Sequence, residues 1–268
     1  MVLVSVITIN RNDSNGLKKT IDSIINQTYK EFEYIVIDGN SNDGSKEVIK
    51  MREAKITYWI SESDTGIYNA MNKGITKANG KYLLFLNSGD YFTDNTVLQN
   101  VVKQLNDEDI VYGDMIIDRN GILEKASSDS PLLFEEMIRG TLWHPVSFIK
   151  KELFNKYGLY NEAYKIISDY DFFLKTIYVY KASTKHIPVY VSVFNTDGIG
   201  SSTKHHALQQ KERYLSQSAY FHPEIIKSAL NYTEMKRSKP QIILNWLKTK
   251  PVLFKVSKLI YSFAKNIV

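Results

Sequence analysis

The sequence contains no cysteine, and this absence excludes disulfide bonds, thiolate metal sites and cysteine nucleophiles together. It also lacks an uninterrupted apolar run of about 18 residues, the length that a membrane-spanning helix needs. The first residues, MVLVSVITIN, have neither the basic region nor the small-residue cleavage site of a secretory signal. We therefore expect a cytoplasmic protein, with a position at the inner face of the plasma membrane left open.

Acidic residues are missing from the last part of the chain, where no Asp or Glu follows Glu234. The net charge of +5 is correspondingly uneven, because basic residues continue through this part. They are Lys236, Arg237, Lys239, Lys248, Lys250, Lys255, Lys258 and Lys265. Such an asymmetry predicts a negatively charged partner, either nucleic acid or an anionic membrane surface.

Within this basic part, a helix is predicted over residues 251–265. Pro251 suits the first helical position, and the apolar residues that follow recur at helical spacing. They are Val252, Leu253, Val256, Leu259, Ile260 and Phe263. A basic amphipathic helix can lie in the headgroup region of an anionic membrane, which favours a membrane over a nucleic acid as the partner. The alternative is a helix that packs on the rest of the chain or on a second subunit, so an oligomer also stays open.

Two nucleotide-binding fingerprints are absent. Neither GxGxxG nor GxxxxGK[ST] follows the first predicted strand, which argues against a dinucleotide-dependent dehydrogenase and a P-loop NTPase. What the chain does contain is an alternation of short apolar strands and amphipathic helices, typical of an α/β domain with a mainly parallel sheet. Strands are predicted at residues 2–9, 32–37, 56–60, 82–86, 109–112 and 189–194. Helices are predicted at residues 17–28, 45–52, 65–79, 97–105, 131–139, 151–157 and 169–180. Residues 115–117 and 122–124 are predicted to form an antiparallel hairpin.

Polar residues collect where the first four strands end. Asn10 to Asp13 follow the first strand, Asp38 to Ser45 the second, Ser61 to Gly66 the third and Asn87 to Asp90 the fourth. Ligands of open α/β sheets bind outside the carboxyl ends of the strands, so four such loops in succession predict a binding crevice. A carboxylate at a strand end suits a hard cation such as Mg²⁺ or Mn²⁺, which often completes its shell with phosphate oxygens.

These segments resemble the inverting family 2 glycosyltransferases, which have the GT-A fold, and within them the transferases of bacterial surface polysaccharides. The resemblance covers roughly residues 2–200. It is carried by VSVITINRN, FEYIVIDGNSNDGS, SESDTGIYNAMNKGITKANGKYLLFLNSGD, WHPVSFIKKELFNKYGLYNE and SDYDFFLK. The resemblance implies transfer of a sugar from a nucleotide diphosphate, with UDP favoured, to a saccharide or lipid-linked saccharide. It also implies a GT-A domain over residues 1–203, with a nucleotide-sugar half (1–115) and an acceptor half (116–203). A helical extension over residues 204–268 would follow.

The resemblance also implies roles for individual residues on the nucleotide side. Asp38 takes the position that accepts a hydrogen bond from the nucleobase, although its usual acidic neighbour is Gly39 here. NSGD takes the place of the family's acidic metal and diphosphate motif, with Asn87 and Gly89 where acids are usual. Only Asp90 is left to hold Mn²⁺ or Mg²⁺, so metal affinity without the donor should be weak. The other expected nucleotide contacts are Thr8, Asn10, Arg11, Asn12, Asp64, Gly66, Asn69, Asn72, Lys73, Ser88 and the backbone or side chains of Asn87 and Gly89.

On the acceptor side, Asp169 in SDYD aligns with the general base that removes a proton from the attacking hydroxyl. Asp171 is the rival base, and helix capping is the structural alternative for either carboxylate. His144 is expected to touch the acceptor or the diphosphate, or else to be a packed, hydrogen-bonded histidine. Two other functions stay open at this point. One is a nucleotidyltransferase, and the other is a nucleotide- or glycan-binding module that has lost catalysis, as the missing acids in NSGD would suggest.

Overall fold

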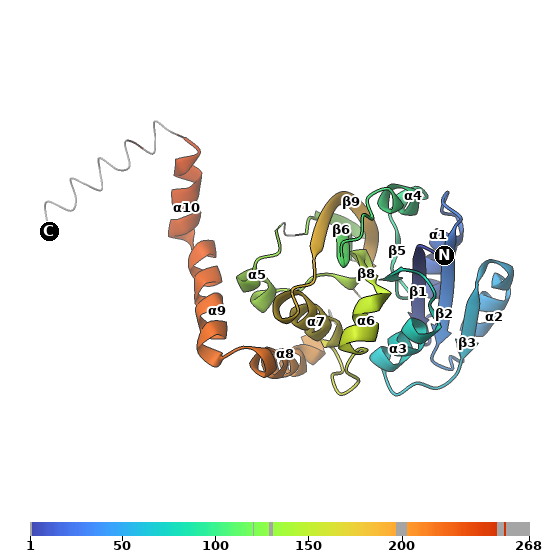
Figure 1. Ribbon diagram of the computed structural model, residues 1–268. Coiled ribbons are helices and arrows are strands. Elements are labelled where there is room, and N and C mark those ends of the chain that lie inside the picture. The colour runs from blue at the N-terminus through green and yellow to red at the C-terminus, as the bar shows by residue number, and fades with distance from the viewer. Residues whose placement is uncertain (1, 120, 129–130, 197–202, 251–254, 256–268) are drawn as a thin grey trace, which may run out of the picture.

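The computed structural model describes residues 2–119, 121–128, 131–196, 203–250 and 255 (Figure 1). A nine-stranded sheet forms its centre, with β3-β2-β1-β4-β8-β6-β9-β5 as neighbours in that order and β7 paired to β6. The strands are β1 (Val4–Asn10), β2 (Phe32–Asp38), β3 (Tyr58–Ser61), β4 (Tyr82–Phe85), β5 (Tyr91–Phe92), β6 (Ile110–Arg119), β7 (Ile122–Ala126), β8 (Ser147–Lys150) and β9 (Thr184–Asn195).

Helices surround this sheet and continue beyond it. They are α1 (Ser14–Ile25), α2 (Ser45–Lys50), α3 (Ile67–Lys77), α4 (Val97–Val102), α5 (Phe134–Arg139), α6 (Lys151–Tyr157), α7 (Ser168–Leu174), α8 (His206–Tyr220), α9 (Pro223–Arg237) and α10 (Lys239–Lys248). Short 3₁₀ turns occupy Glu53–Lys55, His144–Val146 and Thr203–His205, and a π-helical turn, Lys175–Val179, extends α7. None of the helices in the described ranges is both long and apolar enough to cross a bilayer.

β1, β2, β3 and β4 form one parallel part of the sheet, and β6 and β9 also pair in parallel. β1 pairs in parallel with β2 and β4, and β2 pairs in parallel with β3. Antiparallel pairing begins at β8, which lies between β4 and β6. The α/β fold with an antiparallel addition is therefore confirmed. The predicted hairpin also forms, but its first strand is part of a continuous β6, and β8 was not predicted.

Alternation along the buried strands gives the sheet two apolar faces. Ile7 and Ile9 of β1 lie in a core with α3, α6 and α7, while Val4 and Val6 lie in a second core with α1 and α4. A strand that is buried on both faces needs apolar residues at odd and even positions, which explains the unbroken run VSVIT. The polar ends of these strands are consequently the first positions where chemistry can be placed.

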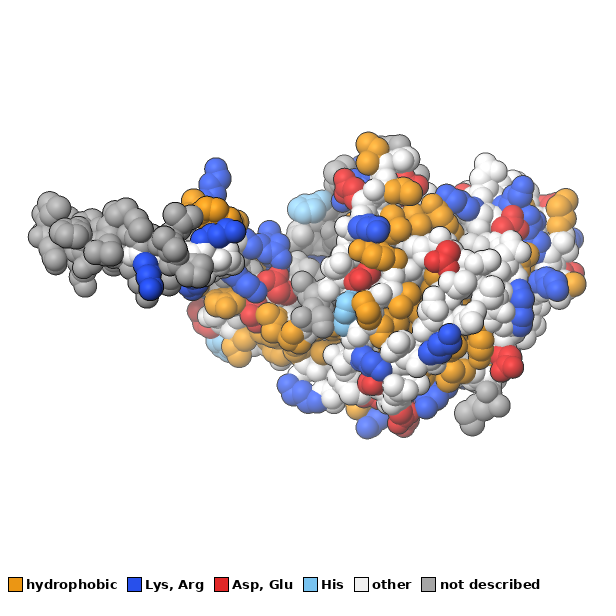
Figure 2. All heavy atoms as spheres, turned by 90° about the horizontal axis from the view of Figure 1, so that it is seen from above, with side chains coloured by type: hydrophobic (Ala, Val, Ile, Leu, Met, Phe, Trp, Pro, Cys, Tyr) orange, Lys and Arg blue, Asp and Glu red, His pale blue; other side chains and the backbone are white. Residues whose placement is uncertain are grey.

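The last helices leave the body of the molecule. α8 packs against α7, and α9 packs against α5. Beyond them, α10 stands away from the sheet, so that α9 and α10 form an arm (Figures 1 and 2). The predicted helix over residues 251–265 lies outside the described residues, apart from Lys255.

Candidate active site

The carboxyl ends of the parallel strands bring four polar loops to one edge of the sheet. The register pairs Asn10 with Asp38, and Asp38 with Ser61, so these three residues lie side by side. The loop after β4 joins the same edge, because the Ser88 N–H donates to the Ile9 carbonyl at 3.1 Å. β1 has β2 on one side and β4 on the other, which makes this edge the switch point of the sheet.

Asp38 lies at the centre of this edge and is fully enclosed, with 0% of its surface exposed. Its Oδ1 accepts hydrogen bonds from Asn10 Nδ2 (2.7 Å) and Ser41 Oγ (2.6 Å). Its Oδ2 accepts from the Ser41 N–H (3.0 Å) and from Ser61 Oγ. Four donors from three loops use this carboxylate to hold the edge together. The expected contact of Asp38 with a nucleobase is therefore not available in this structure.

Two further residues predicted to line the nucleotide are also internal. Thr8 has no exposed surface and donates to the Leu86 carbonyl at 2.8 Å, while Asn10 is 4% exposed and bonds to Asp38. By contrast, Arg11 and Asn12 are exposed. Asn12 adopts φ +53°, donates its N–H to Ser41 Oγ and accepts from the Asn42 N–H, which fixes the turn that presents Arg11.

The space beside Gly39 is filled by a carboxylate from another loop. A Cβ placed on Gly39 would lie 2.5 Å from Asp64 Oδ2 and 3.4 Å from the Cβ and Cδ of Arg11. Asp64 is half-buried, and its Oδ1 accepts a hydrogen bond from the Gly66 N–H at 3.2 Å. Asp64 therefore occupies the volume that a side chain at position 39 would otherwise take, beside Arg11.

Asn69, Asn72 and Lys73 line a hollow beside β2 and β3, and each of them bonds to a neighbouring loop. Asn69 Nδ2 and Asn72 Nδ2 donate to the two carboxylate oxygens of Glu162 at 3.0 and 2.9 Å, and Asn72 also exchanges hydrogen bonds with the backbone of Tyr160. Lys73 Nζ pairs with Glu62 at 2.8 Å and donates to the Ser63 carbonyl. Their approach to the ribose and phosphates stays a prediction. They tie α3 to the loop before α7 and to the loop after β3.

The NSGD turn is fixed by Thr20 of α1, a residue that the sequence did not single out. Thr20 Oγ1 of α1 accepts from the Gly89 N–H and donates to the Asp90 carbonyl at 2.6 Å. Gly89 has φ +95°, in the left-handed region that favours glycine. A glycine here lets the chain turn sharply enough to return the Asp90 side chain to the sheet.

Asp90 is 4% exposed, and its Oδ1 accepts from the backbone N–H of Asn195 at 2.9 Å. Burial raises the pKa of Asp90 to about 7, against the opposing effects of that hydrogen bond and of the charge on His144. Among the residues described, no three His, Cys, Asp or Glu side chains gather in a way that could hold a metal ion. This donor set does not fit a preformed metal centre. It fits an ion that is held by the Asp90 carboxylate together with the oxygens of a bound diphosphate.

Asp169, at the start of α7, lies between two hydrogen-bonding side chains. Its Oδ2 is 3.0 Å from His144 Nδ1, and its Oδ1 is 2.8 Å from the Tyr68 hydroxyl, which also lies 2.6 Å from the Ile166 carbonyl. Burial favours the protonated form of Asp169, but the hydrogen bond and charge of His144, together with Tyr68, outweigh it and hold the pKa below its ordinary value. The carboxylate therefore stays ionised at neutral pH, as a general base requires.

His144 links Asp169 to the NSGD turn. Its Nε2 lies 3.2 Å from Asn87 Nδ2, while Asn87 Oδ1 is buried without a hydrogen-bond partner. Turning the Asn87 amide by 180° lets a protonated Nε2 donate to Oδ1. Burial lowers the pKa of His144, but the hydrogen bond to Asp169 and the charges of Asp169 and Asp90 raise it above its ordinary value overall. The raised pKa favours the cationic form of His144, which lies between the two predicted catalytic loops.

Asp171, the rival base, lies elsewhere. It is 5% exposed, its Oδ1 accepts from Ser216 Oγ at 2.7 Å, and its Oδ2 lies 3.4 Å from the Tyr220 hydroxyl. Both partners belong to α8, so Asp171 anchors that helix on α7. The structure brings Asp169, and not Asp171, together with His144.

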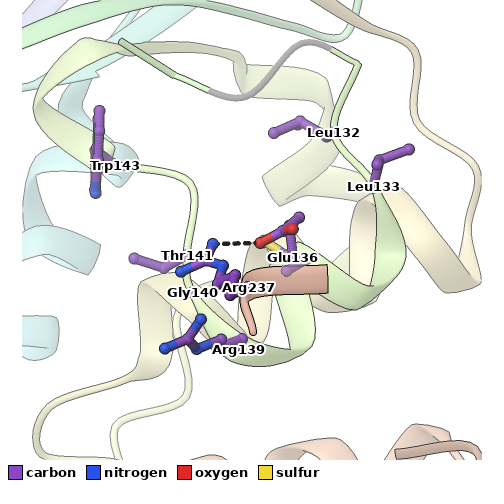
Figure 3. A pocket seen from close by; sticks show the side chains of 9 residues that line it. Leu132, Leu133, Glu136, Arg139, Gly140, Thr141, Trp143 and Arg237 are labelled. Carbon is purple, nitrogen blue, oxygen red and sulfur yellow. Dashed lines mark hydrogen bonds and ion pairs between the residues drawn. The ribbon is translucent and has the colours of Figure 1, made fainter. Parts of the chain in front are cut away.

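A hollow of about 260 Å³ is lined by Trp143, the residue before His144 in the sequence, and extends to α5 and α9 (Figure 3). Its lining combines apolar Leu132 and Leu133 with polar Thr141 and the ion pair between Glu136 and Arg237. Figure 3 shows the Glu136 and Arg237 side chains facing one another, joined by a hydrogen bond. An aromatic side chain together with hydroxyl and charged groups suits a carbohydrate better than a purely apolar ligand.

Comparison of the sequence with known proteins identifies its family. The model of glycosyl transferase family 2 matches residues 5–174, the segment that contains the strand-end loops, His144 and Asp169. The chain belongs to this family. An uncharacterized glycosyltransferase of Mycobacterium tuberculosis is 35% identical over 206 residues, covering 74% of this chain and 77% of the relative. A PGL/p-HBAD biosynthesis glycosyltransferase of Mycobacterium bovis is 28% identical, with 75% of this chain and 80% of the relative covered. The protein is accordingly a glycosyltransferase.

Solved structures with a similar fold confirm the GT-A architecture. Residues 1–349 of Staphylococcus aureus TarS, in complex with UDP-GlcNAc, superpose with a TM-score of 0.65 at 16% identity, covering 85% of this chain and 70% of that TarS chain. The mannosyltransferase PcManGT from Pyrobaculum calidifontis, in complex with GDP-Man and Mn²⁺, gives 0.57 at 15% identity, with coverages of 96% and 86%. At these identities the likeness establishes the fold alone.

Proposed function

We propose that this glycosyltransferase inverts the anomeric centre while it moves a sugar from a UDP-sugar to a saccharide or lipid-linked saccharide, in the synthesis of a bacterial surface polysaccharide. The observation that carries the proposal is the ionised Asp169 carboxylate, held by Tyr68 and joined through His144 to the turn that carries Asp90. This arrangement supports a base and a diphosphate site at opposite ends of one hydrogen-bonded chain. Family membership sets aside the nucleotidyltransferase alternative.

In the proposed reaction, Asp169 takes the proton of an acceptor hydroxyl as the hydroxyl oxygen attacks the anomeric carbon. The bond between that carbon and the diphosphate oxygen breaks, and its electrons stay with the UDP leaving group. Attack from the face opposite the leaving group inverts the centre. Asp90 would hold Mn²⁺ or Mg²⁺ together with the diphosphate, and such an ion would stabilise the charge on the leaving group. The cationic His144, fixed by Asp169, adds positive charge beside the NSGD turn.

The acceptor belongs in the hollow beside Trp143 in this proposal, because Trp143 directly precedes His144, which bonds to Asp169. The membrane contact predicted for residues 251–265 would bring a lipid-linked acceptor close. That segment lies outside the described residues, so its role remains a prediction from sequence.

The decisive experiment is a screen of radiolabelled UDP- and GDP-sugars for slow hydrolysis by the full chain, which needs no acceptor. We expect one UDP-sugar to be hydrolysed in the presence of Mn²⁺ or Mg²⁺, and hydrolysis to stop on addition of EDTA. Proton NMR of the first product should show the anomer opposite to that of the donor. Absence of turnover with every donor, alongside tight UDP binding, would instead support a binding module that has lost catalysis.

Asp64 is proposed to contact the nucleoside in place of Asp38. Asp38 is enclosed by its four donors, whereas the Asp64 carboxylate lies beside Arg11 in the space left open by Gly39. A carboxylate only accepts hydrogen bonds, so it selects a base edge that carries a donor, as the N3–H of uracil does.

We expect Asp64→Asn to weaken UDP binding about tenfold, since a hydrogen bond to a charged group contributes about 1.5–3 kcal/mol. Isothermal titration calorimetry with UDP measures this change. Glu62→Gln is the matched control, because Glu62 is an exposed acid of the same loop that pairs with Lys73. Equal UDP affinity for Asp64→Asn and the unchanged protein would remove Asp64 from the site.

The pH dependence of donor hydrolysis tests the pair of His144 and Asp169. Protonation of Asp90, whose pKa is about 7, and at lower pH of Asp169, whose pKa is depressed, lowers the activity as the pH falls. His144→Phe keeps a ring but removes the hydrogen bond and the charge, so burial then dominates and the pKa of Asp169 rises. We expect the acid limb of the rate profile to move to higher pH.

His186→Phe provides the control for that profile, since His186 forms a comparable pair with Asp114 at 2.9 Å between β6 and β9. The acid limb of the rate profile of His186→Phe should coincide with that of the unchanged protein. A loss of activity by His144→Phe that is equal at every pH would show that His144 has a structural role only.

A further inference from the structure

The arm formed by α9 and α10 carries apolar side chains that nothing in the described chain covers. α9 buries one face against α5 through Ile226, Ala229 and Thr233, and Glu136 of α5 pairs with Lys236 and Arg237 at the end of α9. α5 therefore fixes the base of the arm. The next helix, α10, packs on the end of α9 and projects away from the body (Figure 1).

The exposed surface of α10 has an apolar side and a polar side. Ile242, Ile243 and Trp246 are 54%, 57% and 55% exposed, and they follow one another at i, i+1 and i+4 on one side of the helix. On another side, Gln241 and Asn245 hydrogen-bond to each other at 3.1 Å. Half-exposed residues of this size leave a contiguous apolar stripe in contact with water, which is unfavourable unless a partner covers it.

The charges around the stripe identify the kind of partner. Lys239 precedes Ile242 by three residues and Lys250 follows Trp246 by four, so a cation stands at each end of the stripe, and Lys248 lies on the polar side. No acid occurs in residues 235–268. Figure 2 shows apolar side chains on the arm bordered by Lys and Arg side chains. Apolar residues with a tryptophan, framed by cations alone, match a lipid bilayer with an anionic surface.

We propose that α10 is an in-plane membrane anchor: Ile242, Ile243 and Trp246 insert at the headgroup level of an anionic bilayer while Lys239, Lys248 and Lys250 contact the headgroups. This surface differs from residues 251–265, which the sequence marks by their own apolar pattern. The assignment does not depend on the sugar donor or on the base. Its consequence is that the arm holds the catalytic body at a membrane surface.

The test is cosedimentation of the full chain with vesicles of phosphatidylcholine alone and of phosphatidylcholine with phosphatidylglycerol. We expect binding to the anionic vesicles, weak binding to the neutral ones, and loss of most binding in about 1 M NaCl, where the Debye length falls to about 3 Å. Ile242→Ser/Ile243→Ser should lower the affinity for anionic vesicles at least tenfold. The fluorescence of Trp246, isolated by comparison with Trp246→Phe, should shift to shorter wavelength on binding.

Ile122→Ser/Leu123→Ser is the matched control, because this adjacent pair on β7 is 67% and 57% exposed and lies on the catalytic body. Its vesicle binding should equal that of the unchanged protein, and circular dichroism should show both double variants folded. Failure to bind anionic vesicles overturns the proposal. So does binding that Ile242→Ser/Ile243→Ser leaves unaltered, since another segment would then be the anchor. A dimer detected by light scattering and broken by the α10 variant, without vesicle binding, would assign the stripe to a second copy instead.

Discussion

Asp169→Asn is expected to lower the rate of sugar transfer by about 10²- to 10⁴-fold, the range that loss of a positioned general base produces. The amide keeps the shape of the side chain but cannot accept the proton of the attacking hydroxyl. Binding of UDP should change little, because Asp169 lies on the acceptor side of His144 and bonds to Tyr68. Steady-state kinetics with the donor found in the hydrolysis screen, together with UDP calorimetry, separate these two effects.

Asp171→Asn is the control that lies two residues away on the same helix. Its hydrogen bonds go to Ser216 and Tyr220 of α8, so this variant should transfer sugar at nearly the original rate. It should instead unfold more easily, by about 1–3 kcal/mol, because a buried hydroxyl loses a charged acceptor. The opposite result, with Asp171→Asn inactive and Asp169→Asn active, would exchange the two assignments.

Asp38→Asn is expected to lower the free energy of unfolding by about 2–4 kcal/mol, the largest stability effect that we predict for a single side chain of the site. The carboxylate accepts from Asn10, from Ser61 and twice from Ser41 with none of its surface exposed. An amide group puts its own N–H groups against two of these donors. Urea unfolding followed by circular dichroism measures the change, provided that the slope with denaturant is unaltered.

Asp64→Asn should behave in the reverse manner, with weakened UDP binding and a stability within about 0.5 kcal/mol of the original. Asp64 is half-buried and accepts one backbone hydrogen bond. The two variants therefore distinguish a carboxylate that holds the strand ends together from one that meets the ligand. If Asp38→Asn is as stable as the original protein but no longer binds UDP, the original nucleobase assignment of Asp38 is correct.

The parallel part of the fold could be predicted because its signal is local. Runs such as Val4 to Ile9 are β-branched or apolar apart from one serine, and the apolar stripe of α3 has helical spacing, so both can be recognised without knowing their neighbours. β8 could not be predicted in the same way. It has four residues, begins at Ser147 and ends at Lys150, and is a strand because it pairs with β4 and β6, which lie far away in the sequence.

The site divides along similar lines. The sequence located the strand-end loops and the turn at Asp90, since glycine and small polar residues after an apolar strand mark such turns. It did not reveal Tyr68 or Thr20, because each appears in sequence as one more residue of an amphipathic helix. Their hydroxyls matter through contacts with Asp169, which is 101 residues away from Tyr68, and with Asp90.

By itself, then, the sequence determined the α/β alternation, the edge of the sheet where the polar loops gather, and the acids available there, because backbone preference and hydrophobic periodicity act over a few residues. Only the tertiary structure decided which partners each polar side chain has. Asp38 bonds to Asn10, Ser41 and Ser61, Asp171 to residues of α8, and Asn72 to Tyr160 and Glu162, whereas Asp169 bonds to His144 and Tyr68 and Asp64 stays half-buried. The physical reason is that a buried polar group must find its partners wherever the chain brings them, and those partners lie in other loops and helices.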